Sequence, residues 1–197
     1  AVILVGNVTG NSVPPNFNTY WNQITPENAT EWGSVEGTRN QMNWAAADAA
    51  YNHAQANGYK FKFHTFVWGS QFPGWLTSLT QQQQRAEIEE WIRLACQRYP
   101  NTWAIDVVNE PIKTAMPWKA ALGGDGATGW DWVITSFQIA RQNCPNAQLL
   151  INEYGTENDP PVRITYKNII NLLKARGLID GIGIQAHYFN IDNMNRG

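Results

Sequence analysis

The chain has 197 residues, of which 43% are hydrophobic and 15% are charged, so it can bury a core and is neither disordered nor of low complexity. Its formal net charge is −2, and its Lys and Arg residues are scattered, so we expect neither a nucleic acid nor an anionic membrane as a partner. The most apolar stretches, 147–151 and 181–184, are far shorter than the roughly 20 residues of a membrane-spanning helix. These properties indicate a soluble globular protein.

Short apolar runs alternate with amphipathic ones along the whole chain. The apolar runs predict strands at 1–8, 24–28, 59–66, 103–110, 147–154 and 181–188. The amphipathic runs predict helices at 44–57, 81–98, 130–142 and 162–176, the first closed by Gly58 and the last by Gly177. Alternation of strand and helix is typical of an α/β fold with a parallel sheet. No linker rich in Pro, Gly or Ser divides the elements, so we expect one domain over 1–197.

Polar residues gather where the predicted strands end. They are Glu27, Asn28, His64, Asn109, Glu110, Glu153, Gln185 and His187. In a (β/α)8 barrel the carboxyl ends of the strands carry the active site. A doubly wound sheet also collects polar groups there, but it usually has a Gly-rich phosphate turn after its first strand, and this sequence has none. The pattern therefore favours a barrel.

Glu110 follows the nearly all-apolar run WAIDVV at 103–108 and the amide of Asn109. Loss of water at such a position favours the protonated carboxyl group that a general acid needs. An Asn-Glu pair is also common in ordinary loops, but the run at 64–75 places His64, Trp68 and Gln71 after another strand. Aromatic faces and amides on a loop are suited to binding sugar rings, so we interpret this end as a carbohydrate site.

Five motifs carry a family resemblance. They are TPENATEW at 25–32, HTFVWGSQFPGW at 64–75, DVVNEP at 106–111, LLINEY at 149–154 and GIGIQAHY at 181–188. In order and approximate spacing they resemble glycoside hydrolase family ten, whose members are mostly endo-β-1,4-xylanases, and the match covers practically the whole chain. The resemblance implies a (β/α)8 TIM barrel, of which this chain covers about strands 1 to 6. It also implies retaining hydrolysis of β-1,4-xylosidic bonds, without a cofactor, by a secreted monomer that binds xylan and xylooligosaccharides.

The resemblance also implies a role for individual residues. Glu110 is expected to be the acid/base and Asn109 the partner of the 2-hydroxyl of the cleaved sugar. The remaining residues are expected to bind substrate: His64 and Trp68 at that same subsite, Glu27, Asn28 and Gln71 at the next xylose on the non-reducing side, Tyr154 on the reducing-end side, and Gln185 with His187, whose ring would hold the nucleophile.

The sequence departs from the family pattern at three places. Glu31 stands where the family usually has Lys; either it faces the cleft, where like charges would raise a carboxyl pKa, or it is a solvated turn residue. Gly69 replaces a His, which should leave the cleft wall more open. The nucleophile Glu of the seventh strand has no counterpart, so we expect it beyond Gly197, in a catalytic barrel that is incomplete at the C-terminus.

Two other functions remain possible on the sequence. A non-catalytic xylan-binding barrel or an inactive fragment would keep the cleft without turnover, and the neutral strand ends disfavour a barrel enzyme acting on a phosphorylated substrate. The three His residues show no ligand spacing, so no metal site is expected. Cys96 and Cys144 fit either a disulfide or two buried thiols. Most of the ten Trp residues are expected to fill the core.

Overall fold

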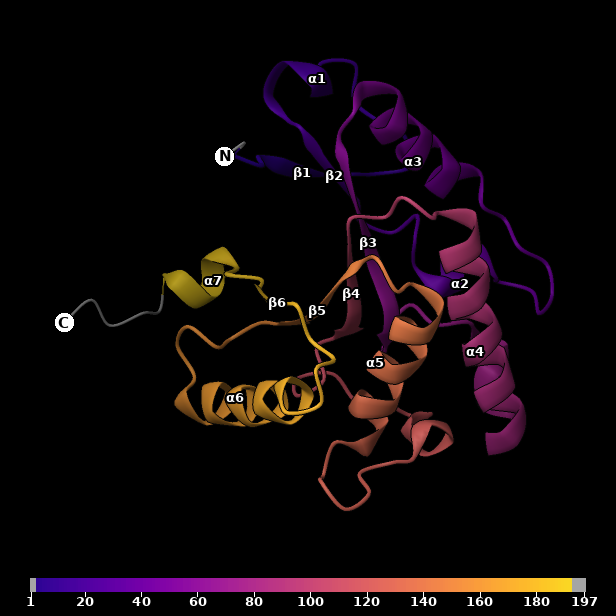
Figure 1. The fold of residues 1–197 in the computed structure, drawn as a ribbon, viewed down its shortest axis with the longest axis vertical. Coiled ribbons are helices and arrows are strands. Elements are labelled where there is room, and N and C mark those ends of the chain that lie inside the picture. The colour runs from indigo at the N-terminus through magenta and orange to yellow at the C-terminus, as the bar shows by residue number, and fades with distance from the viewer. Residues whose placement is uncertain (1–2, 193–197) are drawn as a thin grey trace.

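The computed structural model describes residues 3–192, in which six parallel strands form one sheet in the order β1-β2-β3-β4-β5-β6. The strands are β1 (Gly6–Thr9), β2 (Gln23–Pro26), β3 (Lys60–Trp68), β4 (Ala104–Asn109), β5 (Gln148–Glu153) and β6 (Gly181–Ile184). Within the described residues β1 pairs only with β2 and β6 only with β5, so the sheet is an open arc (Figure 1). The predicted parallel α/β sheet is confirmed, and it has the form of a partial barrel.

Four long helices cover the outer side of the arc (Figure 1). They are α3 (Ala45–Asn57), α4 (Gln81–Arg98), α5 (Asp131–Asn143) and α6 (Pro160–Lys174), each within two residues of its predicted bounds. The short elements were not predicted, because four or five residues show no helical period: α1 (Phe17–Tyr20), α2 (Trp32–Val35), η1 (Gly74–Ser78), η2 (Lys119–Leu122) and α7 (Tyr188–Ile191).

Two predicted strands differ from the structure by more than two residues at one end. The first strand was predicted at 1–8 but runs from Gly6 to Thr9, and residues 1 and 2 lie outside the described part. The last was predicted to reach residue 188 but ends at Ile184. The reason is Ala186, whose φ of 48° is incompatible with a strand and turns the chain into α7.

Local signals fix where the long helices begin and end. Thr80 and Gln83 form a capping box at the start of α4, each side chain bonded to the backbone of the other. Asp159 accepts a hydrogen bond from the amide of Val162 and is followed by Pro160 at the first position of α6. Gly58 ends α3 in the left-handed conformation, with φ of 66°. The caps at Thr80 and Asp159 end the connections that follow β3 and β5, on the side of the sheet where the polar residues lie.

Tryptophans fill the space between the sheet and the helices. Trp91 on α4 is fully buried and stacks against Trp32, with ring centroids 5.8 Å apart, and against Trp44, at 5.6 Å. Trp118 meets Trp32 edge-on, and the indole N–H of Trp91 donates to the carbonyl of Phe66. This stack fixes α2 and the start of α3 against α4, and it confirms that several Trp residues fill the core.

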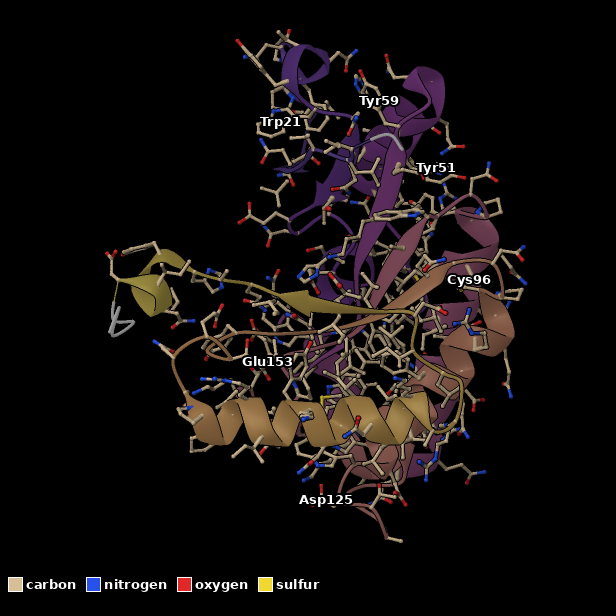
Figure 2. All side chains as sticks on the ribbon, turned by 60° about the vertical axis from the view of Figure 1, so that its left-hand side comes forward. Trp21, Tyr51, Tyr59, Cys96, Asp125 and Glu153 are labelled. Carbon is tan, nitrogen blue, oxygen red and sulfur yellow. A yellow bond between two sulfur atoms is a disulfide. The ribbon has the colours of Figure 1, made fainter. Side chains whose placement is uncertain are left out.

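Cys96 and Cys144 form a disulfide, with Cα atoms 5.4 Å apart, so the alternative of two free thiols is wrong. The bond joins the last turn of α4 to the residue that ends α5. Since these helices run antiparallel to the strands, the disulfide lies at the amino ends of β4 and β5. Figure 2 shows Cys96 at this end and Glu153, the last residue of β5, toward the other. The bond therefore braces the end of the sheet away from the polar residues.

Replacing both Cys96 and Cys144 with Ala should lower the free energy of unfolding by about 4 kcal/mol, the loop-closure value for a separation of 48 residues. Denaturant unfolding of the variant and of the wild-type protein, each with and without reductant, measures the difference. Reductant should destabilise only the wild-type protein. Equal stabilities in oxidising buffer would show that the bond does not constrain the unfolded chain.

Candidate active site

A cleft of about 460 Å³ opens at the carboxyl ends of the strands. Nine of the ten predicted site residues line it: Glu27, Asn28, His64, Trp68, Gln71, Asn109, Glu110, Gln185 and His187. The tenth, Tyr154, lies outside the lining, but its ring centroid is 6.1 Å from that of His187. The structure thus brings together side chains that are separated by up to 160 residues along the chain.

Strand register places the key side chains next to one another. Trp68 on β3, Asn109 on β4 and Asn152 on β5 are direct neighbours in the sheet. One level deeper, His64 on β3 is paired with Asp106 on β4. Because parallel neighbours in register point the same way, each level presents its side chains to the same face.

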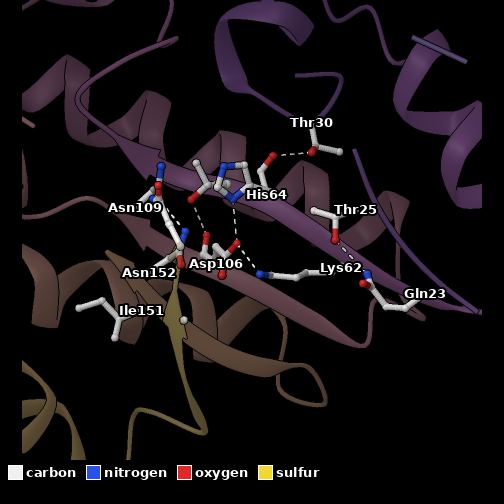
Figure 3. Close-up of polar contacts among 12 residues, drawn as sticks. Gln23, Thr25, Thr30, Lys62, His64, Asp106, Asn109, Ile151 and Asn152 are labelled. Carbon is white, nitrogen blue, oxygen red and sulfur yellow. Dashed lines mark hydrogen bonds and ion pairs between the residues drawn. The ribbon is translucent and has the colours of Figure 1, made fainter. Parts of the chain in front are cut away.

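Asp106 is fully buried at the floor of this cleft. Its Oδ2 atom lies 2.8 Å from His64 Nδ1 and 2.8 Å from Lys62 Nζ (Figure 3). Burial alone would raise the pKa of Asp106, but the hydrogen bond from His64 and the charge of Lys62 outweigh it, and the pKa lies below its usual value. The carboxylate therefore stays ionised and holds both side chains of β3.

Glu110 is half-buried, and its carboxylate accepts three hydrogen bonds. The donors are Trp68 Nε1 at 3.0 Å, Thr114 Oγ1 at 2.7 Å and Gln185 Nε2 at 3.0 Å. Its backbone has φ of 53°, a value that residues other than glycine rarely adopt. Its backbone amide donates to the carbonyl of Asn152. The surrounding structure thus holds the carboxylate at one position in the cleft.

A chain of hydrogen bonds sets the orientation of the amides beside Glu110. His187 Nε2 lies 2.6 Å from Gln185 Oε1, so the amide nitrogen of Gln185 points at Glu110 and, at 3.2 Å, at Asn109 Oδ1. Asn152 Nδ2 also donates to Asn109 Oδ1, at 2.8 Å. With its oxygen already accepting two hydrogen bonds, Asn109 has its NH2 group left to donate to a ligand.

Gly183 on β6 makes room for this network. A Cβ atom at this position would lie 2.4 Å from Asn152 Oδ1, which is closer than two atoms that are not bonded to each other can approach. Any larger residue would displace Asn152 and, with it, the orientation of Asn109.

Comparisons with known proteins agree with this geometry. The model of glycosyl hydrolase family 10 matches residues 2–196. The chain belongs to glycosyl hydrolase family 10. It is 47% identical over 185 residues to endo-1,4-beta-xylanase B of Cellvibrio japonicus, covering 93% of this chain and 30% of that protein. It is 31% identical over 190 residues to endo-1,4-beta-xylanase A of Caldicellulosiruptor saccharolyticus, covering 89% of this chain and 54% of that protein.

Solved structures of the family share the fold. An endo-1,4-beta-xylanase from Caldicellulosiruptor owensensis has a TM-score of 0.76 at 29% identity, over 87% of this chain and 54% of that one. A glycosylated endo-beta-1,4-xylanase from Gloeophyllum trabeum has a TM-score of 0.80 at 28% identity, over 92% of this chain and 61% of that one. The chain thus spans about half, or less, of the length of the curated relatives it matches. Its six strands are part of the (β/α)8 barrel of family 10.

Glu31 is not a solvated turn residue, so that alternative is wrong. Its side chain is 2% exposed and lies 3.7 Å from the Nε2 atom of His64, although it is absent from the lining of the cleft. Burial, followed by the charges of Asp106 and Glu110, raises the pKa of Glu31 well above its ordinary value of 4.5. The turn is buried because the neighbouring Trp32 belongs to the aromatic stack.

The expected opening of the cleft wall at Gly69 is also wrong. A Cβ atom there would lie 1.9 Å from the carbonyl oxygen of Ala115. The segment after β4 occupies the space that a side chain at position 69 would need. Gly69 therefore permits close packing of two loops.

Seven residues of the cleft lining were not predicted as site residues: Val8, Thr25, Pro26, Lys62, Asp106, Asn152 and Ile184. Three of them, Lys62, Asp106 and Asn152, belong to the ion pairs and hydrogen bonds of the site. Lys60, Lys62 and His64 alternate with Phe residues along β3, which is the period-two signal of a polar face. Asp106 is a lone charge in an apolar strand, a pattern that requires a buried partner. Both patterns can be seen in the sequence, but neither shows that Lys62 and Asp106 pair with each other.

Glu153 is the polar residue predicted at the end of the fifth strand, and it is the last residue of β5. It is fully buried and accepts hydrogen bonds from the amides of Ile112 and Tyr154. Burial raises the pKa of Glu153 despite these bonds. Its contacts tie the segment after β4 to β5, and it is absent from the lining of the cleft.

Within residues 3–192, no three or more His, Cys, Asp or Glu side chains form a group able to hold a metal ion. In the same range, none of the helices has the length and apolar character needed to cross a bilayer.

Asp106→Asn should lower the melting temperature at pH 7, since Lys62 and His64 lose the charge that they face. The lowered pKa means that Asp106 stabilises the fold above its ordinary value of 3.8, and that this stabilisation is lost as pH falls through the lower folded value. The difference between variant and wild type should therefore shrink below about pH 4. Thermal unfolding from pH 7 to pH 2.5 measures it.

Asp125→Asn is the matched control, because Asp125 pairs with Lys119 but its side chain is 61% exposed. It should change the melting temperature little at any pH. If Asp106→Asn lowers the melting temperature by the same amount at pH 2.5 and pH 7, the negative charge assigned to Asp106 is wrong.

Proposed function

We propose that the protein is an endo-β-1,4-xylanase that cleaves xylan with retention of configuration and uses Glu110 as acid/base. The observation that carries the proposal is the position of Glu110, at the carboxyl end of β4 in the cleft, with three donors fixing its carboxylate. The relatives named above as endo-1,4-beta-xylanases support the choice of xylan.

In the first step Glu110, in its protonated form, gives its proton to the glycosidic oxygen, and the bond from that oxygen to the anomeric carbon breaks. A second carboxylate bonds to the anomeric carbon and forms a glycosyl-enzyme intermediate. In the second step Glu110 takes a proton from water, whose oxygen replaces the carboxylate at that carbon. We propose that a Glu beyond Gly197 supplies the second carboxylate.

The cleft residues divide by position into subsites. Asn109, whose NH2 group is free to donate, is proposed to bind the 2-hydroxyl of the cleaved sugar, where such bonds strengthen in the transition state. His64 and Trp68 would contact the same sugar. Glu27, Asn28 and Gln71 would bind the next xylose on the non-reducing side. Tyr154 would contact the reducing-end side, and Gln185 with His187 would hold the nucleophile.

We further infer that residues 1–197 are one domain, the first six strands and their helices of the catalytic barrel. The exposed apolar side chains of Val8 on β1 and Ile182 and Ile184 on β6, at the two ends of the arc, support further strands there. The disulfide supports secretion, because such bonds persist in oxidising compartments. The partners would be xylan and xylooligosaccharides, bound by a monomer.

Glu110→Gln should lower turnover of xylan by roughly 100- to 10,000-fold, because acid assistance is lost while the side chain keeps its shape. Release of reducing ends from xylan measures turnover, and calorimetric binding of xylotetraose tests whether the cleft is intact. The variant should bind the oligosaccharide without cleaving it.

Glu89→Gln is the control, since Glu89 is half-exposed on α4 and pairs with Arg85. It should retain full activity. Wild-type turnover in Glu110→Gln would remove Glu110 from its role. Binding without release of reducing ends by the wild-type protein would favour a non-catalytic xylan-binding barrel instead.

A further inference from the structure

Glu31 is a buried acid for which the mechanism above has no use. It precedes α2, and its neighbours in the chain hold it in place: Thr30 donates to the carbonyl of His64, Trp32 lies in the aromatic stack, and the amide of Gly33 donates to the carbonyl of Gln71. The side chain therefore cannot turn out to solvent without moving the wall of the cleft.

The carboxyl group of Glu31 lies next to the imidazole ring of His64. Its Oε1 atom is buried, has no hydrogen-bond partner among the described residues, and is 3.7 Å from His64 Nε2. The opposite ring atom, Nδ1, is 2.8 Å from Asp106. The imidazole thus lies between two carboxyl groups. That of Asp106 is hydrogen-bonded to it, and that of Glu31 is about 1 Å farther away than a hydrogen bond requires.

The surrounding charges decide which partner holds a proton. The titratable groups around Glu31 in the described chain are His64 on β3, Asp106 on β4 and Glu110 at the end of β4. Lys62, the lysine in the lining of the cleft among the described residues, is paired with Asp106. Two acids and no free cation disfavour a third negative charge, and burial of an unpaired carboxylate is costly as well.

We propose that Glu31 is a positioning residue for His64: its carboxylic acid donates to Nε2 of the ring while Asp106 accepts from Nδ1, so that both nitrogens are fixed before a sugar binds. The ring is then neutral, with its proton on Nδ1. The ring, whose centroid is 6.3 Å from that of Trp68, is thereby held in one orientation in the cleft where the sugar would bind. Only this consequence for sugar binding rests on the proposed function.

Two variants at position 31 separate positioning from mere structural support. Glu31→Gln keeps a donor for Nε2 but cannot ionise, whereas Glu31→Ala removes the donor. Glu31→Gln should keep the KM for xylotetraose within about 2-fold, and Glu31→Ala should raise it about 3- to 10-fold, the effect of one hydrogen bond, with a smaller change in kcat. Equal losses in both variants, or no loss in Glu31→Ala, would overturn the proposal.

Nitrogen-15 spectra of labelled histidine give a readout that needs no turnover. At pH 7 the wild-type protein and Glu31→Gln should both show His64 protonated at Nδ1 and bare at Nε2, the signal being identified by its loss in His64→Asn. On raising the pH, the wild-type Nε2 signal should shift as Glu31 loses its proton, and this step should be absent from Glu31→Gln. A wild-type spectrum in Glu31→Ala, or the same pH step in Glu31→Gln, would overturn the pairing.

Glu36→Gln is the matched control. Glu36 lies on the same segment and is as buried as Glu31, but its carboxylate accepts from Trp32 Nε1 and from the amide of Asn40. It should leave the His64 signals and the KM unchanged, and a matching change would overturn the specific role of Glu31. If the wild-type protein shows the pH step but releases no sugar from xylan, the proton pairing stands and the proposed xylanase function fails.

Discussion

A carboxylate buried in a sheet is stable only where charged or polar partners replace its lost water, and the floor of the cleft is arranged around one such group, Asp106. Its partners both come from the neighbouring strand, and Thr65 donates to its backbone carbonyl as well. The ladder between β3 and β4 is irregular just beyond this point. One charge therefore determines where His64 and Lys62 point and how the two strands are joined beneath the cleft.

The hydrogen bonds above this floor fix which end of each side-chain amide is the donor and which is the acceptor. A ring nitrogen of His187 orients Gln185, Gln185 donates to Glu110 and Asn109, and Asn152 donates to Asn109. Reversing any amide would place two donors or two acceptors face to face. The cleft thus obtains its orientation from the folded strands rather than from a ligand, which is the condition for binding without a large ordering cost.

The sequence predicted features that depend on local pattern and missed those that depend on packing. The strands and long helices follow from apolar periodicity, and the grouping of nine site residues follows because parallel strand ends meet at one edge. The pairing of Lys62 with Asp106 depends on the register of β3 against β4, which no motif encodes. Burial of Glu31 depends on the stacking of Trp32, and the contact at Gly69 on where a distant loop lies.

Three acids near the cleft show that burial raises a carboxyl pKa unless charged partners outweigh it. Asp106, Glu31 and Glu153 are all buried. Asp106 faces a lysine and a ring N–H, and its pKa lies below the usual value. Glu153 accepts only from backbone amides, and burial raises its pKa. The Oε1 atom of Glu31 has no hydrogen-bond partner among the described residues, and burial raises the pKa of Glu31 well above the usual value. Since each negative charge raises the cost of the next, ionisation of Asp106 favours a neutral Glu31. The fold can therefore hold several carboxyl groups close to Glu110 without holding several charges there.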